Sequence, residues 1–294
     1  MNEDIFNKEK ILAFSKEYDL LSEENISLVL KAADEIQNDE ERKTLCYKLL
    51  ELMRKGISTD KLAPPDDGSL KSEFALFFPV WRMAEEFAED AGKRGVSHEI
   101  IHKSLRGIDS CLTGNKELKG RPGTSAYFFW LPLHGQGKLF RIGDFQYELT
   151  SHEGKNAIGV HIPKGTKLNV HQNLNSFKEA LDFFEQYYSE YKMSGFVCES
   201  WLLNPHIEEI MGKKTNISLF GDMFDRFDIG DTVGKSIYRF VYKLPAPCPV
   251  DELTEETSLQ RNIKNYLKAG NKVLSYGGFI SKAKLNQMLK DLEE

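Results

Sequence analysis

The segment "NAIGVHIPKGTKLNVHQNLNSFKEALDFFEQYYSEYKMSGFVCESWLL", residues 156–203, decides the fold of this chain. It opens with a run of apolar residues, "NAIGVHIP", that predicts a strand ended by its proline. Residues 176–191 then predict an amphipathic helix, with a capping box from Ser176 and Glu179 at its start. "GFVCESWLL", residues 195–203, predicts a second strand. Two strands joined through a helix are expected to be parallel, with a right-handed crossover.

The flanking sequence extends this unit into a sheet. Residues 126–149, "AYFFWLPLHGQGKLFRIGDFQYEL", predict two strands around a glycine-containing turn. After the unit, Pro205 opens a short helix, and residues 216–229 and 235–244 each predict a further strand. Residues 258–270 predict a last helix. The predicted order β-β-β-α-β-α-β-β indicates a mixed β-sheet with flanking helices.

The first 115 residues carry helical patterns and almost no strand signal. Ser22 is expected to begin one helix, Asn38 with Glu41 to cap the next, and Ser97 to cap a helix that ends at Gly114.

The pattern changes at "GNKELKGRPGTS", where a helical run gives way to turn residues and then to strand signals. We therefore place a domain boundary there, with an all-helical N-terminal domain over 1–118 and the sheet domain over 119–294. The fold class expected is α+β.

The composition narrows the classes of function. The chain has 294 residues, a net charge of −6 and scattered Lys and Arg, which argues against nucleic-acid and membrane-surface partners. No apolar run is long enough to span a bilayer, and the acidic start "MNEDIFNKEK" is unlike a signal peptide. The four cysteines are far apart and form no CxxC pair, as expected of reduced thiols in a cytoplasmic protein.

One short motif points to metal chemistry. His98-Glu99-Ile100-Ile101-His102 has the H-E-x-x-H spacing of zinc-protease helices. Its context argues against that function, because Ser97 places His98 in the fraying first turn and Leu105 and Ile108 stand where the extended motif has Gly and His. Glu117, in the linker, is the one third ligand that stays open. We expect two solvent-facing histidines and no metal site.

Four stretches, taken in order and spacing, carry a resemblance to a known family: "RIGDFQYEL" (141–149), "VHIPKG" (160–165), "CESWLLNP" (198–205) and "TNISLF" (215–220). They resemble a bacterial family of GNAT-like acyltransferases, in which a helical N-acyltransferase-type domain precedes a GNAT-like domain. The resemblance implies transfer of an acyl group from acetyl-CoA or another acyl-CoA to an amine of a small molecule or peptide. It leaves the acceptor and the oligomeric state open.

The same resemblance implies where the acyl-CoA binds. A strand donates backbone hydrogen bonds to the pantetheine arm, and the following loop and helix start take the pyrophosphate, because free N–H groups favour anions. The glycine-rich loop usual in GNAT proteins is absent, and "PKGTKLNVHQNLNS" stands in its place. The implied cofactor-binding residues are Val160, Lys164, Gly165, Thr166, Lys167 and Ser176.

His161 is the principal candidate for a catalytic base, because it ends its strand and imidazole titrates near neutral pH. On the next strand Cys198 and Ser200 share a face, and we expect one of them to approach His161. Gln146 and Glu148 share a face of the preceding strand and are expected to reach the same cleft. Glu148 is a second candidate base, and Gln146 and Trp201 are candidate substrate contacts.

Each of these residues also has a structural interpretation. A histidine at a strand end is often held by hydrogen bonds, and Cys198 and Trp201 fit an apolar core. Two other functions remain open. A Cys198–His161 pair would make a thiol hydrolase or transferase. The absent glycine-rich loop favours a catalytically silent GNAT-like module that binds a ligand or a protein.

Overall fold

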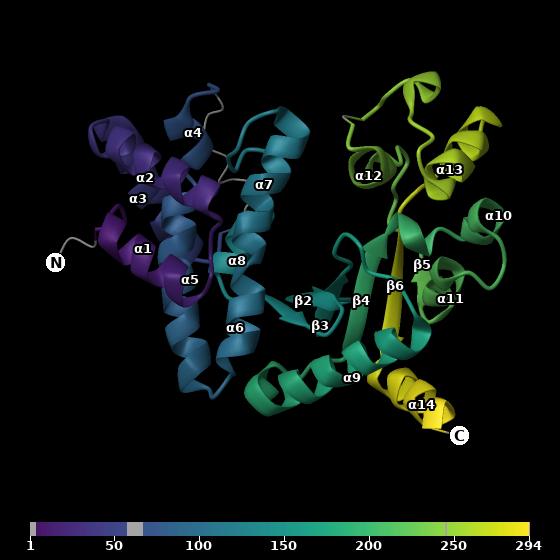
Figure 1. Ribbon diagram of the computed structural model, residues 1–294. Helices are drawn as coiled ribbons and strands as arrows, with labels where there is room; N and C mark the ends of the chain where they lie inside the picture. The colour runs from purple at the N-terminus through teal and green to yellow at the C-terminus, as the bar shows by residue number, and fades with distance from the viewer. Residues whose placement is uncertain (1–3, 58–66, 245, 294) are drawn as a thin grey trace. The chain divides into compact units, whose positions relative to one another are not determined.

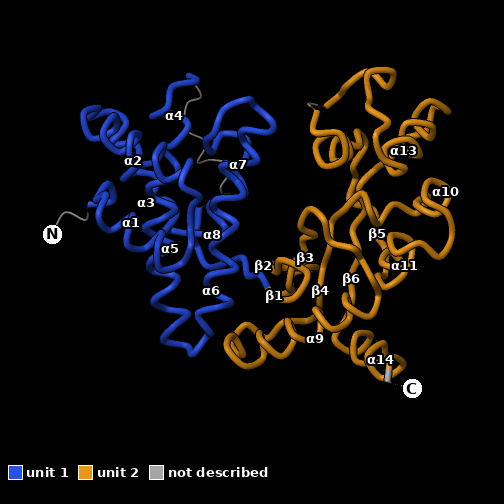
Figure 2. Tube along the Cα trace, in the orientation of Figure 1, with its two compact units in different colours: residues 1–141 blue, residues 142–294 orange. Residues whose placement is uncertain are grey.

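The computed structural model describes residues 4–57, 67–244 and 246–293. The chain divides into two compact units, residues 1–141 and residues 142–294, coloured blue and orange in Figure 2. The first unit is helical and the second contains nearly all of the sheet, so the α+β prediction is confirmed.

The helices of the first unit are short and amphipathic. Ser97 caps one of them through the N–H of Ile100, as predicted, whereas Asp39 rather than Asn38 caps another through the N–H of Arg42. The helices are α1 (Lys8–Glu17), α2 (Glu23–Gln37), α3 (Glu40–Arg54), α4 (Leu70–Phe74), α5 (Phe77–Lys93), α6 (His98–Leu105), α7 (Gly107–Lys119) and α8 (Leu131–Gly135) (Figure 1).

Gly114 does not end a helix, contrary to the prediction. It lies inside α7, which continues to Lys119 and ends at Gly120 in the left-handed conformation. A side chain at position 114 would place its Cβ 2.5 Å from the hydroxyl of Tyr127. The glycine is therefore explained by close packing against that ring.

A buried carboxylate keeps residues beyond 118 in the first unit. Glu73 is 2% exposed, and its oxygens accept hydrogen bonds from Arg121 Nε (2.6 Å) and Ser125 Oγ (2.9 Å). The backbone N–H of Thr124 also donates to the carbonyl of Glu73. These bonds tie the segment to α4, so the compact units divide after residue 141, later in the chain than the predicted boundary at 118/119.

The sheet has six strands in the order β1-β2-β3-β4-β6-β5. β3 and β4 are parallel, as predicted, while the pairs β2–β3, β4–β6 and β6–β5 are antiparallel. The strands are β1 (Leu139–Ile142), β2 (Phe145–His152), β3 (Lys155–His161), β4 (Gly195–Ser200), β5 (Asp225–Phe227) and β6 (Tyr276–Ser281).

The helices of the second unit are α9 (Val170–Tyr187), α10 (Ile207–Met211), α11 (Asn216–Asp222), α12 (Lys235–Ile237), α13 (Ser258–Lys268) and α14 (Lys282–Glu293). A single turn of π-helix, Tyr238–Tyr242, continues α12, and one 3-10 turn, Trp201–Leu203, follows β4. In Figure 1 α9 and α14 run beside the lower end of β4 and β6.

Two strand predictions were right only in part, and a third was wrong. The first part of 126–149 forms turns and α8, and the two strands of that stretch are β1 and β2, joined at Gly143. Residues 216–222 form α11, because Thr215 caps the N–H of Ser218, and only the short β5 follows. Residues 235–242 are helical, and Tyr242 donates a hydrogen bond to the carbonyl of Gln260.

The strand β6 and the helix α14 have no counterpart among the predicted elements. β6 contains Gly277 and Gly278, which interrupt the alternation of side chains that marks a strand. Their Cβ atoms would lie 2.1 Å from the ring of Phe227 and 2.7 Å from Phe224 Cβ, respectively. The packing of β6 requires these glycines, and they remove the alternating pattern from which the strand could have been predicted.

The core of the second unit lies between α9 and one face of the sheet. Its aromatic rings contact one another with centroids 5.1–6.2 Å apart, and the main members are Phe145, Tyr147, Phe177, Phe196 and Phe220. α9 begins earlier than predicted, with Asn169 accepting from the N–H of Gln172. The predicted capping box at Ser176 is therefore wrong.

Candidate active site

β3 and β4 separate toward their carboxyl ends. Their register contains only the pairs Ile158–Phe196 and Gly159–Val197, although β3 continues to His161 and β4 to Ser200. On their outer sides both strands stay paired to the end, β3 with β2 and β4 with β6. Two parallel strands therefore open between Val160–His161 and Cys198–Ser200, which leaves room for an extended ligand to pair with strand backbone.

His161 and Glu148 meet beside this opening. Glu148 pairs with Gly159 in the β2–β3 register, and His161 is two residues further along β3, so both side chains project from one face. His161 Nε2 lies 2.7 Å from Glu148 Oε2, and the side chains are 32% and 22% exposed. An ionised carboxylate can only accept, so it fixes the proton on Nε2 and leaves the lone pair of His161 on Nδ1.

Gly159 gives the pair its space. A Cβ at this position would lie 3.3 Å from Glu148 Cβ and 3.4 Å from His161 Nε2. Gln146, the register partner of His161, projects from the same face as Glu148, as the alternation predicts. The site is thus built from two adjacent strands and one glycine between their side chains.

Cys198 and Ser200 do not approach His161, contrary to our expectation. The pair Gly159–Val197 places Val197 and Glu199 on the His161 face, so Cys198 and Ser200 project from the opposite face. Burial raises the pKa of the Cys198 thiol to about 12, with a further contribution from the charge of Glu199. This buried thiol lacks the thiolate character of a nucleophile, and the Cys–His hydrolase hypothesis is not supported.

Ser200 and Trp201 have structural contacts in this fold. The hydroxyl of Ser200 accepts a hydrogen bond from the N–H of Leu202 and caps the turn after β4. Trp201 is 7% exposed and belongs to the core rather than to an open cleft.

The loop between β3 and α9 holds the predicted phosphate ligands. Gly165 adopts a φ of 87°, and the N–H and hydroxyl of Thr166 both donate to the carbonyl of Pro163, at 3.2 and 2.8 Å. These bonds occupy the donors of Thr166 in the loop's own turn. Lys164 and Lys167 are exposed. The loop thus presents two ammonium groups ahead of α9.

Ser176 is buried within α9 and does not lie at a helix start. Its hydroxyl donates to the carbonyl of Ile142, accepts from the N–H of Asp144 and lies 2.9 Å from the hydroxyl of Tyr147. These contacts fix the β1–β2 turn against α9. Because Ser176 was predicted as a phosphate ligand only through its place at a helix start, the structure removes the basis of that prediction.

The sequence did not indicate Tyr191 as a neighbour of the site. Its hydroxyl donates to the carbonyl of Thr150, and its pKa is raised, first by burial and then by the charge of Glu148. Tyr191 follows α9 in the chain and reaches the β2–β3 hairpin only because the chain returns there to enter β4. No local pattern could reveal this contact.

The H-E-x-x-H segment makes other contacts. His98 stacks on Tyr18 with ring centroids 4.8 Å apart, His102 Nε2 lies 3.8 Å from Asp19 Oδ2, and Glu99 pairs with Lys103. Within residues 4–57, 67–244 and 246–293, no group of three or more His, Cys, Asp or Glu side chains is placed to hold a metal ion. None of the helices in these ranges has the length and apolarity of a bilayer-crossing segment.

Comparisons with known proteins agree with this architecture. Residues 17–137 match the model of an N-acyltransferase N-terminal domain, and residues 139–280 match that of a GNAT-like C-terminal domain. No curated protein matches the chain.

Solved structures with the same fold are acyltransferases. One is in complex with decanoyl-CoA and teicoplanin, at 21% identity and a TM-score of 0.78, with 91% of this chain and 86% of that one covered. A mutant acyltransferase in complex with octanoyl-CoA has 21% identity and a TM-score of 0.80, with 93% and 88% covered. The fold is therefore that of an acyltransferase. The chain belongs to the GNAT-like family that has an N-acyltransferase N-terminal domain before a GNAT-like C-terminal domain.

Proposed function

We propose that this protein is an acyl-CoA-dependent N-acyltransferase. The observation that carries the proposal is the opening between β3 and β4 with the His161–Glu148 pair beside it. Val160 lies beyond the last β3–β4 pair, and the edge of β3 that it presents toward β4 suits the amide groups of a pantetheine arm. Lys164 and Lys167 follow on the loop, where they suit the pyrophosphate.

The transfer needs a base at one atom. The acceptor amine attacks the carbonyl carbon of the thioester, and a C–N bond forms while the C–S bond breaks. Nδ1 of His161 takes the proton from the attacking nitrogen, and Glu148, bonded to Nε2, stabilises the imidazolium that results. CoA leaves as the thiolate and takes a proton from water. Gln146 lies on the same face, which supports its contact with the acceptor.

The substrates follow from the fold relatives by analogy. Those relatives are described in complex with decanoyl-CoA, octanoyl-CoA and the glycopeptide teicoplanin. We therefore propose that the acyl donor extends beyond acetyl-CoA to acyl chains of this length, and that the acceptor is an amine on a small molecule or peptide.

A thermal-shift and turnover experiment tests the proposal. The full chain is titrated with acetyl-, octanoyl- and decanoyl-CoA, and release of free thiol is then followed with a panel of amines. A ligand at 100 times its Kd stabilises the folded state by about 2.7 kcal/mol, so at least one thioester should raise Tm by several degrees. Thiol release should then require an amine.

The other outcomes separate the remaining hypotheses. No shift and no thiol release with any thioester would contradict the proposal. A clear shift without release, for every amine, would instead support a silent module that binds CoA. The donors of Thr166, which are used within the loop, are the feature that favours this second function.

A further inference from the structure

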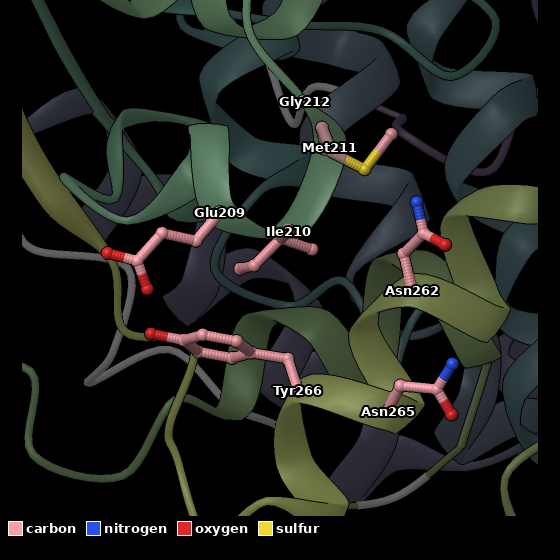
Figure 3. Close-up of a pocket in the computed structure, with 7 residues that line it drawn as sticks. All are labelled: Glu209, Ile210, Met211, Gly212, Asn262, Asn265 and Tyr266. Atoms are coloured by element: carbon pink, nitrogen blue, oxygen red, sulfur yellow. The ribbon is translucent and has the colours of Figure 1, made fainter.

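A hollow of about 330 Å³ lies between α10 and α13, away from the β3–β4 opening (Figure 3). α13 contributes Asn262, Asn265 and Tyr266, which share one helix face by their spacing. The facing wall is residues 209–212. The volume falls in the range of about 300–1,000 Å³ that is typical of small-molecule sites.

The side chains of this hollow suit a purine base. Ile210 and Met211 supply apolar surface, and the ring of Tyr266 can stack on a base. The amides of Asn262 and Asn265 each offer a donor and an acceptor, the pattern that matches the N6 and N7 edge of adenine. Figure 3 shows the ring of Tyr266 directed toward Glu209 and Ile210, with the amides of Asn262 and Asn265 at the other end of the view.

A basic turn borders the hollow. Gly212, in the wall, accepts a hydrogen bond from Thr215 Oγ1 at 3.3 Å, which closes the turn containing Lys213 and Lys214. Both lysines are exposed, and Lys214 has a φ of 60°. Among the residues that the structure describes, no ion pair joins either of them to a carboxylate.

The same turn is connected to the loop between β3 and α9. Asn216 directly follows it, and the Asn216 side-chain amide donates to the carbonyl of Lys167 at 2.9 Å. The Lys213–Lys214 turn therefore lies between two other features. The proposed pyrophosphate loop is on one side of it and the hollow is on the other. The nucleotide half of CoA has the same order, because the pyrophosphate leads to a ribose that carries both the 3′-phosphate and the adenine.

We infer that the hollow and the Lys213–Lys214 turn bind the 3′-phosphorylated adenosine of CoA, with the lysines on the 3′-phosphate and Tyr266 on the base. The inference rests on the proposed function, because it names where the nucleotide end of its donor binds. The carboxylate of Glu209 also lines the hollow, where its Oε1 lies 2.9 Å from His206 Nδ1.

The test compares CoA, 3′-dephospho-CoA and adenosine 3′,5′-bisphosphate by calorimetric titration of the full chain. The wild type should bind CoA more tightly than dephospho-CoA. The double variant Lys213→Ala, Lys214→Ala should lower the affinity for CoA by about 10- to 100-fold and leave the affinity for dephospho-CoA within about threefold of the wild type. The matched control, Lys10→Ala with Lys16→Ala, removes the same charge from exposed positions of α1 and should change neither affinity.

The base contacts have their own variants. Tyr266→Ala should lower the affinities for CoA and dephospho-CoA equally, by about 10-fold. Tyr266→Phe keeps the ring, so its affinities should stay near those of the wild type. Thermal unfolding of each variant verifies that it is folded. The inference is overturned if the Lys213/Lys214 variant keeps the full preference for CoA, or if Tyr266→Ala binds CoA like the wild type.

The two proposals fail in different ways. Acyl transfer by the wild type together with unchanged CoA affinity in these variants would refute the nucleotide site alone. Binding of adenosine 3′,5′-bisphosphate that depends on Lys213 and Lys214, without acyl transfer to any amine, would refute the acyltransferase alone. Absence of binding by all three ligands would refute both.

Discussion

At the scale of single residues, the His161–Glu148 pair is the feature on which the proposed chemistry depends. Its 2.7 Å contact is made by side chains that are about a quarter exposed, so the pair is both positioned and accessible. A histidine held this way by a carboxylate keeps one tautomer and one ring orientation. Gly159 is the third member, because any side chain there would crowd the two.

Removal of the base is the first prediction. We expect His161→Ala to lower kcat/KM by about 100- to 10,000-fold, because general base catalysis contributes factors of this size. Glu148→Gln should also lower kcat/KM, because an amide cannot stabilise the imidazolium. The loss should be smaller than in His161→Ala, because the base itself remains. Steady-state thiol release measures both variants. An unchanged kcat/KM in His161→Ala would argue against a base at this position.

Crowding of the pair is the second prediction. Gly159→Val should reduce turnover to nearly the level of His161→Ala, because its side chain would fill the space between Glu148 and His161. Gly154→Ala on the β2–β3 turn is a matched control, since no atom lies within 4 Å of the added Cβ. The control residue has a φ of 73°, so a small loss of stability but no loss of turnover is expected. Equal activity of the two variants would show that the pair is not needed.

Thiol reactivity gives a third prediction. Cys46, Cys111 and Cys198 are buried, whereas Cys248 is partly exposed. Burial raises the pKa of Cys198 to about 12, so native protein near neutral pH should be alkylated at Cys248 first and at Cys198 only after unfolding. Peptide mapping after a timed reaction with iodoacetamide measures the order. Rapid labelling of Cys198 in the native protein would restore it as a candidate nucleophile.

At the scale of elements, the segment between β5 and β6 is held at its two ends by one carboxylate. Asp231 accepts from the N–H groups of Val233 and Gly234 near the start of the segment and from that of Ser275 just before β6. Burial alone would raise the pKa of Asp231, but these three backbone donors outweigh it, and the pKa is lowered below its usual value. The ionised form is therefore preferred in the folded state.

The fourth prediction concerns this carboxylate. A group whose folded pKa is depressed stabilises the fold above its unfolded pKa, and the effect is lost as the pH falls through the folded pKa. Asp231→Asn should therefore lower the free energy of unfolding at pH 7 by about 1–2 kcal/mol. The difference from the wild type should shrink as the pH falls below about 4. Urea unfolding at several pH values measures it, and a difference as large at pH 3 as at pH 7 would contradict this account.

At the scale of the whole molecule, the chain has two units with separate cores, and every residue proposed to bind CoA belongs to the second. The three tryptophans divide between them, because Trp81 and Trp130 lie in the first unit and Trp201 in the second. Trp201 is buried, so its fluorescence reports on the integrity of the second core.

This division gives the fifth prediction. In a Trp81→Phe, Trp130→Phe variant, CoA should raise the temperature of the Trp201 transition, because a ligand stabilises the unit that binds it. The reciprocal Trp201→Phe variant reports on the first unit. If CoA raised only the transition of the first unit, the proposed location of the ligand would be wrong.

The sequence predicted the broad architecture well. The helical first part, the parallel pair β3 and β4 and the helix between them all follow from periodicity and connection rules. The errors share a cause. Ser176 and Gly114 are residue types that are common at helix ends, but both lie inside helices. The hydroxyl of Ser176 donates to the distant carbonyl of Ile142, and Gly114 packs against the ring of Tyr127. Local patterns do not contain these partners.

The sequence by itself determined the fold class, the place of His161 at a strand end and the shared face of Gln146 and Glu148. These properties depend on neighbours a few residues apart, and alternation fixes them. Only the tertiary structure decided that Glu148 meets His161 and that Cys198 projects from the opposite face. The physical reason is register, since a shift of one residue between paired strands exchanges the side chains of the two faces.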